Sequence, residues 1–127
     1  MSIKTTLLKD RQLTIHTAHG VLSYEVILAA IKAYNATQPT TYVLWDLREA
    51  ILTQLTADRL RTIIHFSTQY DSLRPGGKTA LVVSNRPGDY GMARMAEIMN
   101  NVEKSDIDLE AFHDYDEALA WLGVKCA

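Results

Sequence analysis

The sequence predicts an α/β fold with a mainly parallel sheet of four or five strands and an N-terminal β-hairpin. Two apolar, β-branched runs, residues 41–47 and 78–84, are typical of strands that are covered on both faces. Segments with apolar residues three and four positions apart lie between these runs and after the second one. This alternation of strand and helix is typical of a parallel α/β sheet.

The hairpin is predicted for residues 4–8 and 13–18, because apolar and polar residues alternate there on either side of the turn-like residues 9–12. One face of the hairpin is expected to carry alternate residues of both strands, namely Ile3, Thr5, Leu7, Leu13, Ile15 and Thr17. The hairpin gives the otherwise parallel sheet one antiparallel edge.

Two helices are predicted in the first half of the chain. The first follows Ser23, a residue type that caps helix N-termini. Its inward stripe consists of Tyr24, Ile27, Leu28, Ile31 and Tyr34. The second is expected over residues 57–70, with Thr56 as N-cap and Asp58 in the first turn. The Pro-Gly-Gly sequence at 75–77 separates it from the next strand.

Two further helices are predicted in the second half. The third spans residues 89–102, and its inward stripe consists of Met92, Met95, Ala96, Met99 and Val102. A strand follows at 107–112. Asp114 and Glu117 then form a capping box for a last short helix, which ends at Gly123.

Composition indicates one globular domain, residues 1–127. The chain is 47% apolar and 22% charged, which is sufficient for a substantial core. The formal net charge is -2, with acidic and basic residues interspersed. Nucleic acid is therefore excluded as an expected partner, and peripheral membrane contact is not expected either.

The N-terminal residues lack a secretory pattern, and no apolar run approaches the ~20 residues of a membrane span, so the cytoplasm is the expected location. A single cysteine, Cys126, excludes an internal disulfide and a cysteine-based zinc site. The histidines lack ligand spacing. We expect no metal and no cofactor.

The strongest candidate site lies at residues 85–95, between a predicted strand and a predicted helix. Open α/β folds bind ligands at this end of their strands. Arg86, Tyr90 and Arg94 can together bind a carboxylate or phosphate, and Gly88 and Gly91 permit close backbone approach. The alternative is structural: Arg94 pairs with Glu97 or Asp89, Tyr90 packs over the sheet edge, and the glycines only permit the turn.

A second group, Asp46 and Arg48, ends the strand at 41–47 and is expected at the same edge of the sheet. No acidic pair of the kind that binds magnesium accompanies Asp46, so pairing with Arg48 or local backbone is its expected role. An enzyme that uses Asp46 and His65 as acid and base is the least favoured hypothesis, because no catalytic motif surrounds them.

The chain resembles the bacterial SpoIIAA-like proteins, which are grouped near STAS domains and the lipid-binding CRAL-TRIO domains. The resemblance covers nearly the whole chain. It rests on the order of elements, the strand end at 45–48 (Trp-Asp-Leu-Arg), the helix start at 89–95 and the closing segment 111–122. It implies a four-turn βα superhelix, in a domain without a known enzymatic activity.

STAS domains of the anti-sigma antagonist type carry a phosphorylatable serine at the start of the helix after the central strand. The corresponding segment here, residues 46–58, contains no serine and no glycine. Thr53 or Thr56 can accept phosphate at this helix N-terminus. The alternative for Thr56 is a capping role alone.

The expected function is therefore a regulatory or protein-interaction domain, acting as a monomer or a homodimer. The alternative is a small-molecule or lipid-binding module for a small apolar or anionic ligand. Its pocket is expected to be lined by Phe66, Tyr70, Tyr90, Met92, Met95 and Met99. Exposed apolar residues such as Ile51 and Ile98 can support a dimer.

Overall fold

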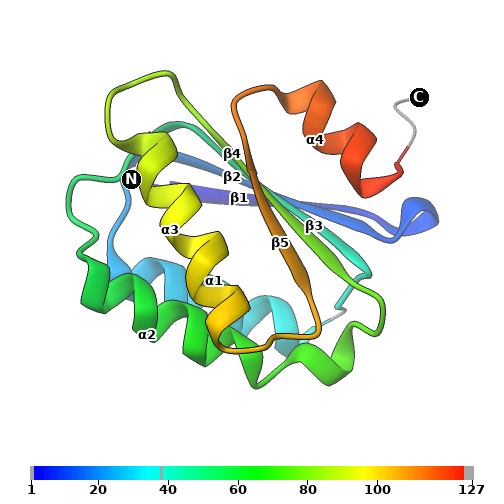
Figure 1. The fold of residues 1–127 in the computed structure, drawn as a ribbon. Coiled ribbons are helices and arrows are strands. Elements are labelled where there is room, and N and C mark those ends of the chain that lie inside the picture. Colours follow the sequence, from blue (N-terminus) through cyan, green and yellow to red (C-terminus); the bar gives the residue numbers. More distant parts are fainter. Residues whose placement is uncertain (1, 38, 125–127) are drawn as a thin grey trace.

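The computed structural model describes residues 2–37 and 39–124. It contains one sheet whose strands are hydrogen-bonded in the order β1-β2-β3-β4-β5 (Figure 1). The first pair is antiparallel and the other three pairs are parallel. The strands are β1 (Ser2–Leu8), β2 (Leu13–Val21), β3 (Tyr42–Ile51), β4 (Lys78–Val83) and β5 (Asp108–Phe112). Cys126 lies outside the described residues.

Helices cover both faces of this sheet. The α-helices are α1 (Tyr24–Ala36), α2 (Ala57–Thr68), α3 (Asp89–Val102) and α4 (Tyr115–Leu122), and the short 3-10 helices are η1 (Lys9–Arg11) and η2 (Asp71–Leu73). The first three α-helices share one buried cluster, to which they contribute Ile27, Ile63 and Ala93. The last packs on the opposite face, where Leu119 meets Leu44. Figure 1 shows the three connecting helices on one side of the sheet and α4 on the other.

The helix boundaries follow from the caps that the sequence predicts. Ser23 Oγ accepts a hydrogen bond from Val26 N at 3.3 Å, and Thr56 Oγ1 accepts one from Arg59 N at 3.1 Å. Asp114 caps α4 through the first-turn amide groups. The bounds of α3 agree with the prediction, whereas β3 extends four residues beyond the predicted strand.

The predicted face of the hairpin is wrong. Thr5 lies opposite His16, and Leu7 lies opposite Thr14, so these residues share the face toward α1. Leu13, Ile15 and Thr17 therefore point to the other face, toward α4. The sequence could not show this because β2 is covered on both faces, and Leu13 and Thr14 are both buried.

The inward stripe of α3 also differs from the prediction. Val102 is 74% exposed, whereas Asn100 is buried. The buried positions, Ala93, Ala96 and Asn100, keep the spacing of three and four residues but follow a different line along the helix. Burial of the polar Asn100 is possible because its Nδ2 donates to the Ile107 carbonyl at 2.8 Å.

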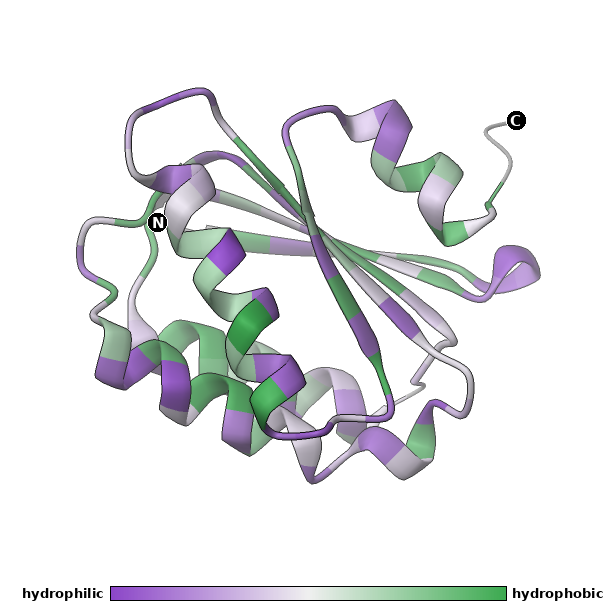
Figure 2. Cartoon of the chain, viewed as in Figure 1, coloured by the Kyte–Doolittle hydropathy of each residue, from purple (hydrophilic) through white to green (hydrophobic). Residues whose placement is uncertain are grey.

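Hydrophilic residues concentrate in the turn between β1 and β2 and in the segment between β4 and α3 (Figure 2). None of the described helices is long and apolar enough to cross a membrane.

Gly77 and Gly91 provide a matched test of the packing. A Cβ at Gly77 would lie 2.8 Å from Arg74 O, 2.8 Å from Ile107 Cδ1 and 3.0 Å from Thr41 O. A Cβ at Gly91, in the first turn of α3, would meet nothing within 4 Å. Gly77→Ala should lower the free energy of unfolding by about 1–3 kcal/mol. Gly91→Ala should raise it by about 0.5–1 kcal/mol through helix propensity. Urea denaturation measures both, and equal effects would contradict this account.

Candidate functional site

The second half of β3 carries a salt bridge between Asp46, near the middle of the strand, and Arg48. The guanidinium donates to both carboxylate oxygens, with Nε–Oδ1 and Nη2–Oδ2 distances of 2.8 Å. It also lies over the ring of Tyr115, 4.9 Å from the centroid. These side-chain hydrogen bonds lower the pKa of Asp46 and raise the pKa of Arg48. Asp46 thus pairs with Arg48, as the sequence analysis expected.

Arg86 joins the turn before α3 to the end of β3. Its Nη2 donates to the carbonyl oxygens of Ala50 at 2.5 Å and Arg48 at 3.3 Å. Its Nε donates to Ser84 Oγ at 3.1 Å and lies 3.4 Å from Asp89 Oδ2. The Ser84 hydroxyl donates to the same carboxylate at 2.6 Å. The side chain is fixed by these contacts and remains half exposed.

Tyr90 and Arg94 lie on the side of α3 that faces β5. The Tyr90 ring stacks on the ring of His113, with centroids 4.4 Å apart and an interplanar angle of 24°. Arg94 pairs with Glu97 through a 2.7 Å hydrogen bond. The other Glu97 oxygen accepts the main-chain N–H of Ala111 at 2.8 Å, at the outer edge of the sheet. Arg94 therefore has the structural partner that the alternative named.

The two glycines leave space at the start of α3. Gly88 is the N-cap and has a φ of 90°, in the left-handed region. A Cβ at Gly88 or Gly91 would have no non-neighbouring atom within 4 Å. Binding by these residues stays a prediction.

The structure brings Asp46, Arg48, Arg86 and Tyr90 to the predicted edge of the sheet, with Arg94 one helical turn further along α3. Sequence reasoning missed His113 and Tyr115, which contact Tyr90 and Arg48. The rule that locates ligands at the carboxyl ends of parallel strands also applies to β5 and could have found both.

Thr53 and Thr56 lie between β3 and α2. Both are exposed, and the Thr56 hydroxyl caps α2. The geometry is that of an ordinary helix N-terminus, and phosphorylation stays a prediction.

Asp46 and His65 do not form an acid–base pair. Asp46 lies on the α4 face of the sheet, whereas His65 lies in the layer of connecting helices and contacts Glu103 at 2.9 Å. Within residues 2–37 and 39–124, no three His, Cys, Asp or Glu side chains are arranged to hold a metal ion.

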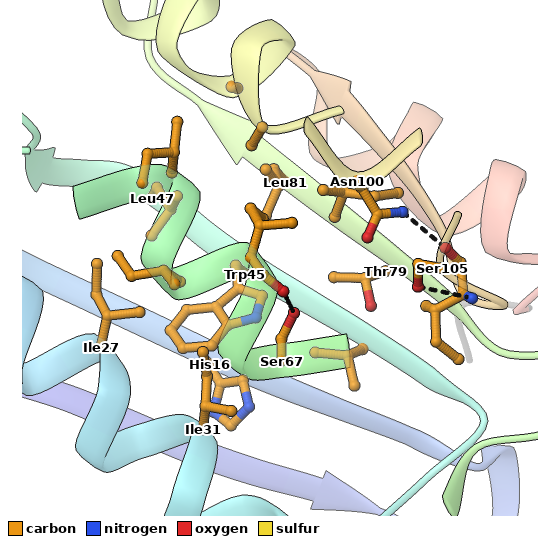
Figure 3. Close-up of a pocket in the computed structure, with 18 of the residues that line it drawn as sticks. His16, Ile27, Ile31, Trp45, Leu47, Ser67, Thr79, Leu81, Asn100 and Ser105 are labelled. Atoms are coloured by element: carbon orange, nitrogen blue, oxygen red, sulfur yellow. Dashed lines mark hydrogen bonds between the residues drawn. The ribbon is translucent and has the colours of Figure 1, made fainter. Parts of the chain in front are cut away.

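A cavity of about 150 Å³ lies between the sheet and the three connecting helices (Figure 3). Its walls are mainly aliphatic and include Ile27, Ile31, Leu47 and Leu81. Polar groups gather near the amino ends of β3 and β4, where His16, Asn35, Arg74 and Thr79 reach the wall. This cavity was not located from the sequence.

Of the six expected lining residues, Tyr70 and Met92 line the cavity. The expectation is wrong for the other four: Phe66, Tyr90, Met95 and Met99. Met95 and Met99 pack with Leu60 in a separate cluster between α2 and α3. Phe66 packs edge-on against Tyr70, and Tyr90 lies outside on His113.

His16 is a buried titratable side chain in the cavity wall. It is 1% exposed and packs against Trp45, with ring centroids 4.3 Å apart and an interplanar angle of 38°. Its Nδ1 lies 2.9 Å from Thr5 Oγ1. Burial and, to a smaller extent, the charge of Arg74 lower the pKa of His16 to about 4. The ring is neutral at pH 7.

No protein-family model and no curated protein matches this chain. Solved structures do match. An anti-sigma factor antagonist from Mycobacterium paratuberculosis has a TM-score of 0.56 and 16% identity, over 96% of this chain and 95% of that chain. The anti-sigma factor antagonist SpoIIAA in its unphosphorylated form has a TM-score of 0.50 and 13% identity, over 96% and 98%. The chain has the SpoIIAA-like fold, which confirms the predicted architecture.

His16 predicts an acid-sensitive component of stability. In the unfolded chain, His16 takes up a proton as the pH falls below its ordinary pKa of 6.5. In the folded chain, it does so only when the pH approaches 4. The contribution of neutral, buried His16 to the free energy of unfolding is therefore fully present above pH 6.5, and it is lost as the pH drops toward 4. The free energy of unfolding should decrease by about 2 kcal/mol between pH ~7 and pH ~4.5 from this group. His16→Phe should lack this component in urea titrations, and an unchanged pH dependence would contradict the assignment.

Proposed function

We propose that the chain is a non-enzymatic regulatory domain that acts in the cytoplasm by binding a protein partner. The observation that carries this proposal is its likeness, over 96% of its length, to two anti-sigma factor antagonists. The name of those proteins describes action on another protein. The paired arginines and the separated Asp46 and His65 also support binding over catalysis.

The surface proposed for this contact is the recognition edge, defined by Arg48, Arg86, Tyr90, Arg94 and His113. Arginine and tyrosine dominate the binding energy of many protein interfaces. The Tyr90 ring is 37% exposed and already held by His113, so little conformational entropy is lost on binding.

Apolar area adjoins the recognition edge. Val21 and Ile51 lie opposite each other at the ends of β2 and β3, and both are exposed. Because Arg48 and Arg94 already have acidic partners, we expect apolar and aromatic contact to supply most of the affinity. The same area, together with Ile98 on α3, is available to a second copy of the chain, and a homodimer stays a prediction.

Phosphorylation at Thr53 or Thr56 is the proposed means of regulating this contact. Thr53 is exposed in the turn that follows Ile51 and precedes α2. A phosphate there would lie beside the helix N-terminus, where the dipole favours negative charge, and close to the apolar pair.

Alanine at Tyr90 tests the recognition edge. In affinity isolation from the native host, the wild-type protein and Lys32→Ala, a control on the exposed surface of α1, should retain the same partner. Tyr90→Ala should weaken binding of the purified partner by about tenfold or more, because the stacked ring is removed. Equal dissociation constants for the three proteins would exclude this surface.

A second candidate function is binding of a small molecule in the cavity. It is favoured by aliphatic walls combined with a few converging polar groups, the usual composition of ligand sites. We expect native mass spectrometry of freshly purified protein to show an additional mass that denaturation removes. Its consistent absence, with no thermal shift in a metabolite and lipid screen, would exclude this function.

A further inference from the structure

The polar end of the cavity is organised around the Arg74 guanidinium. Its Nε donates to Thr40 O at 2.8 Å, and Nη2 donates to Thr41 O at 3.1 Å and Lys78 O at 2.9 Å. Nη1 donates to Thr79 Oγ1 at 3.0 Å. Guanidinium has five N–H donors, so one N–H of Nη1 has no acceptor among residues 2–37 and 39–124.

No carboxylate lies within salt-bridge distance of Arg74 in the described part of the chain. Asp71 acts on it only at longer range, and its Oδ2 accepts hydrogen bonds from Ser105 Oγ at 2.8 Å and Asp106 N at 3.0 Å. Arg74 is partly buried, and an arginine that is largely withdrawn from water is normally paired with an anion. The free N–H belongs to the nitrogen that bonds Thr79, whose side chain projects into the cavity (Figure 3).

Further polar atoms at the cavity wall have no partner. Asn35 Oδ1 is buried and accepts no hydrogen bond, while Asn35 Nδ2 donates to Ile31 O at 2.9 Å. The indole N–H of Trp45 has no acceptor among the residues that the structure describes. The positive charge of Arg74 favours an anion at this wall, whereas Asn35 Oδ1 is an acceptor and fits only a hydrogen-bond donor of the ligand.

We propose that the cavity binds a small monocarboxylic acid, with its carboxylate at Arg74 Nη1 and its hydrocarbon part along Ile31, Leu47 and Leu81. This inference rests on the second candidate function and specifies its ligand class. A single charge matches the single free N–H, whereas a phosphate dianion would bury a second charge without a partner. A cavity of this volume holds a ligand of about six to ten non-hydrogen atoms.

The apolar end of the cavity fits the hydrocarbon part of a monocarboxylic acid. Figure 3 shows Ile27 and Leu47 on the side of the cavity away from Thr79 and Asn100. The polar end lies at the amino edge of β3 and β4, and the aliphatic walls continue toward the carboxyl edge. The proposed orientation follows from this separation of polar and apolar groups along one axis.

Hexanoate and 1-hexanol test the inference because they share a hydrocarbon chain and differ in charge. Trp45 lines the cavity and Trp121 packs on the α4 face, so Trp45 fluorescence in a Trp121→Phe background reports on the cavity. Hexanoate should give a saturable change, with a dissociation constant about tenfold or more below that of hexanol. Leu81→Phe, which fills part of the cavity, should weaken hexanoate binding by about tenfold.

Leu73→Phe is the matched control, because Leu73 is exposed on η2 and does not line the cavity. It should bind hexanoate like the parent. The inference would be overturned by no saturable change up to about 10 mM, by equal affinity for hexanol, or by equal hexanoate affinity in the Leu81→Phe variant. Equal affinity for hexanol would leave the second candidate function intact. Arg74→Gln, where it folds, should abolish the preference for hexanoate; retained preference would also overturn it.

Discussion

The order of the strands is the constraint on which the rest of this molecule depends. Each parallel strand is added beside the preceding one, so the three connecting helices pack on the same face and leave the other to α4. The sheet is consequently buried on both faces along β3 and β4. The carboxyl ends of the strands then gather the turns that carry the recognition edge, while their amino ends gather the main-chain carbonyls that hold Arg74.

Local signals in the sequence predicted most of the fold. Ser23 and Asp114 fixed helix starts because a cap acts through its own first turn and needs no distant partner. The face of β2 and the stripe of α3 depend on tertiary packing. Hydropathy predicted that Val102 faces inward on α3, and it gave no reason to bury Asn100. In the structure the carbonyl of Ile107 accepts a hydrogen bond from Asn100, so the asparagine is buried in its place.

The candidate site was predictable in position but not in pairing. Parallel strands place Arg48 and Arg86 at one edge whatever their partners, so topology alone brings them together. Whether Arg86 is free depends on the Ala50 carbonyl, 36 residues away in the chain, and no sequence pattern encodes that contact. The cavity was even harder to predict, because side chains from β2, β3, β4, β5 and the three connecting helices line it, and only tertiary packing brings them together.

Arg74 and the cavity do not follow the rules of burial and close packing that predict the rest of the core. An unfilled space of about 150 Å³ beside the core forgoes side-chain packing that would stabilise the fold. Partial burial of the Arg74 guanidinium disfavours its charge, and the buried, neutral His16 lowers the stability of the fold in acid. Local rules of stability are broken in natural proteins mainly where function requires it. The proposed carboxylic acid would fill the cavity and pair with the partly buried Arg74, and so would account for both departures.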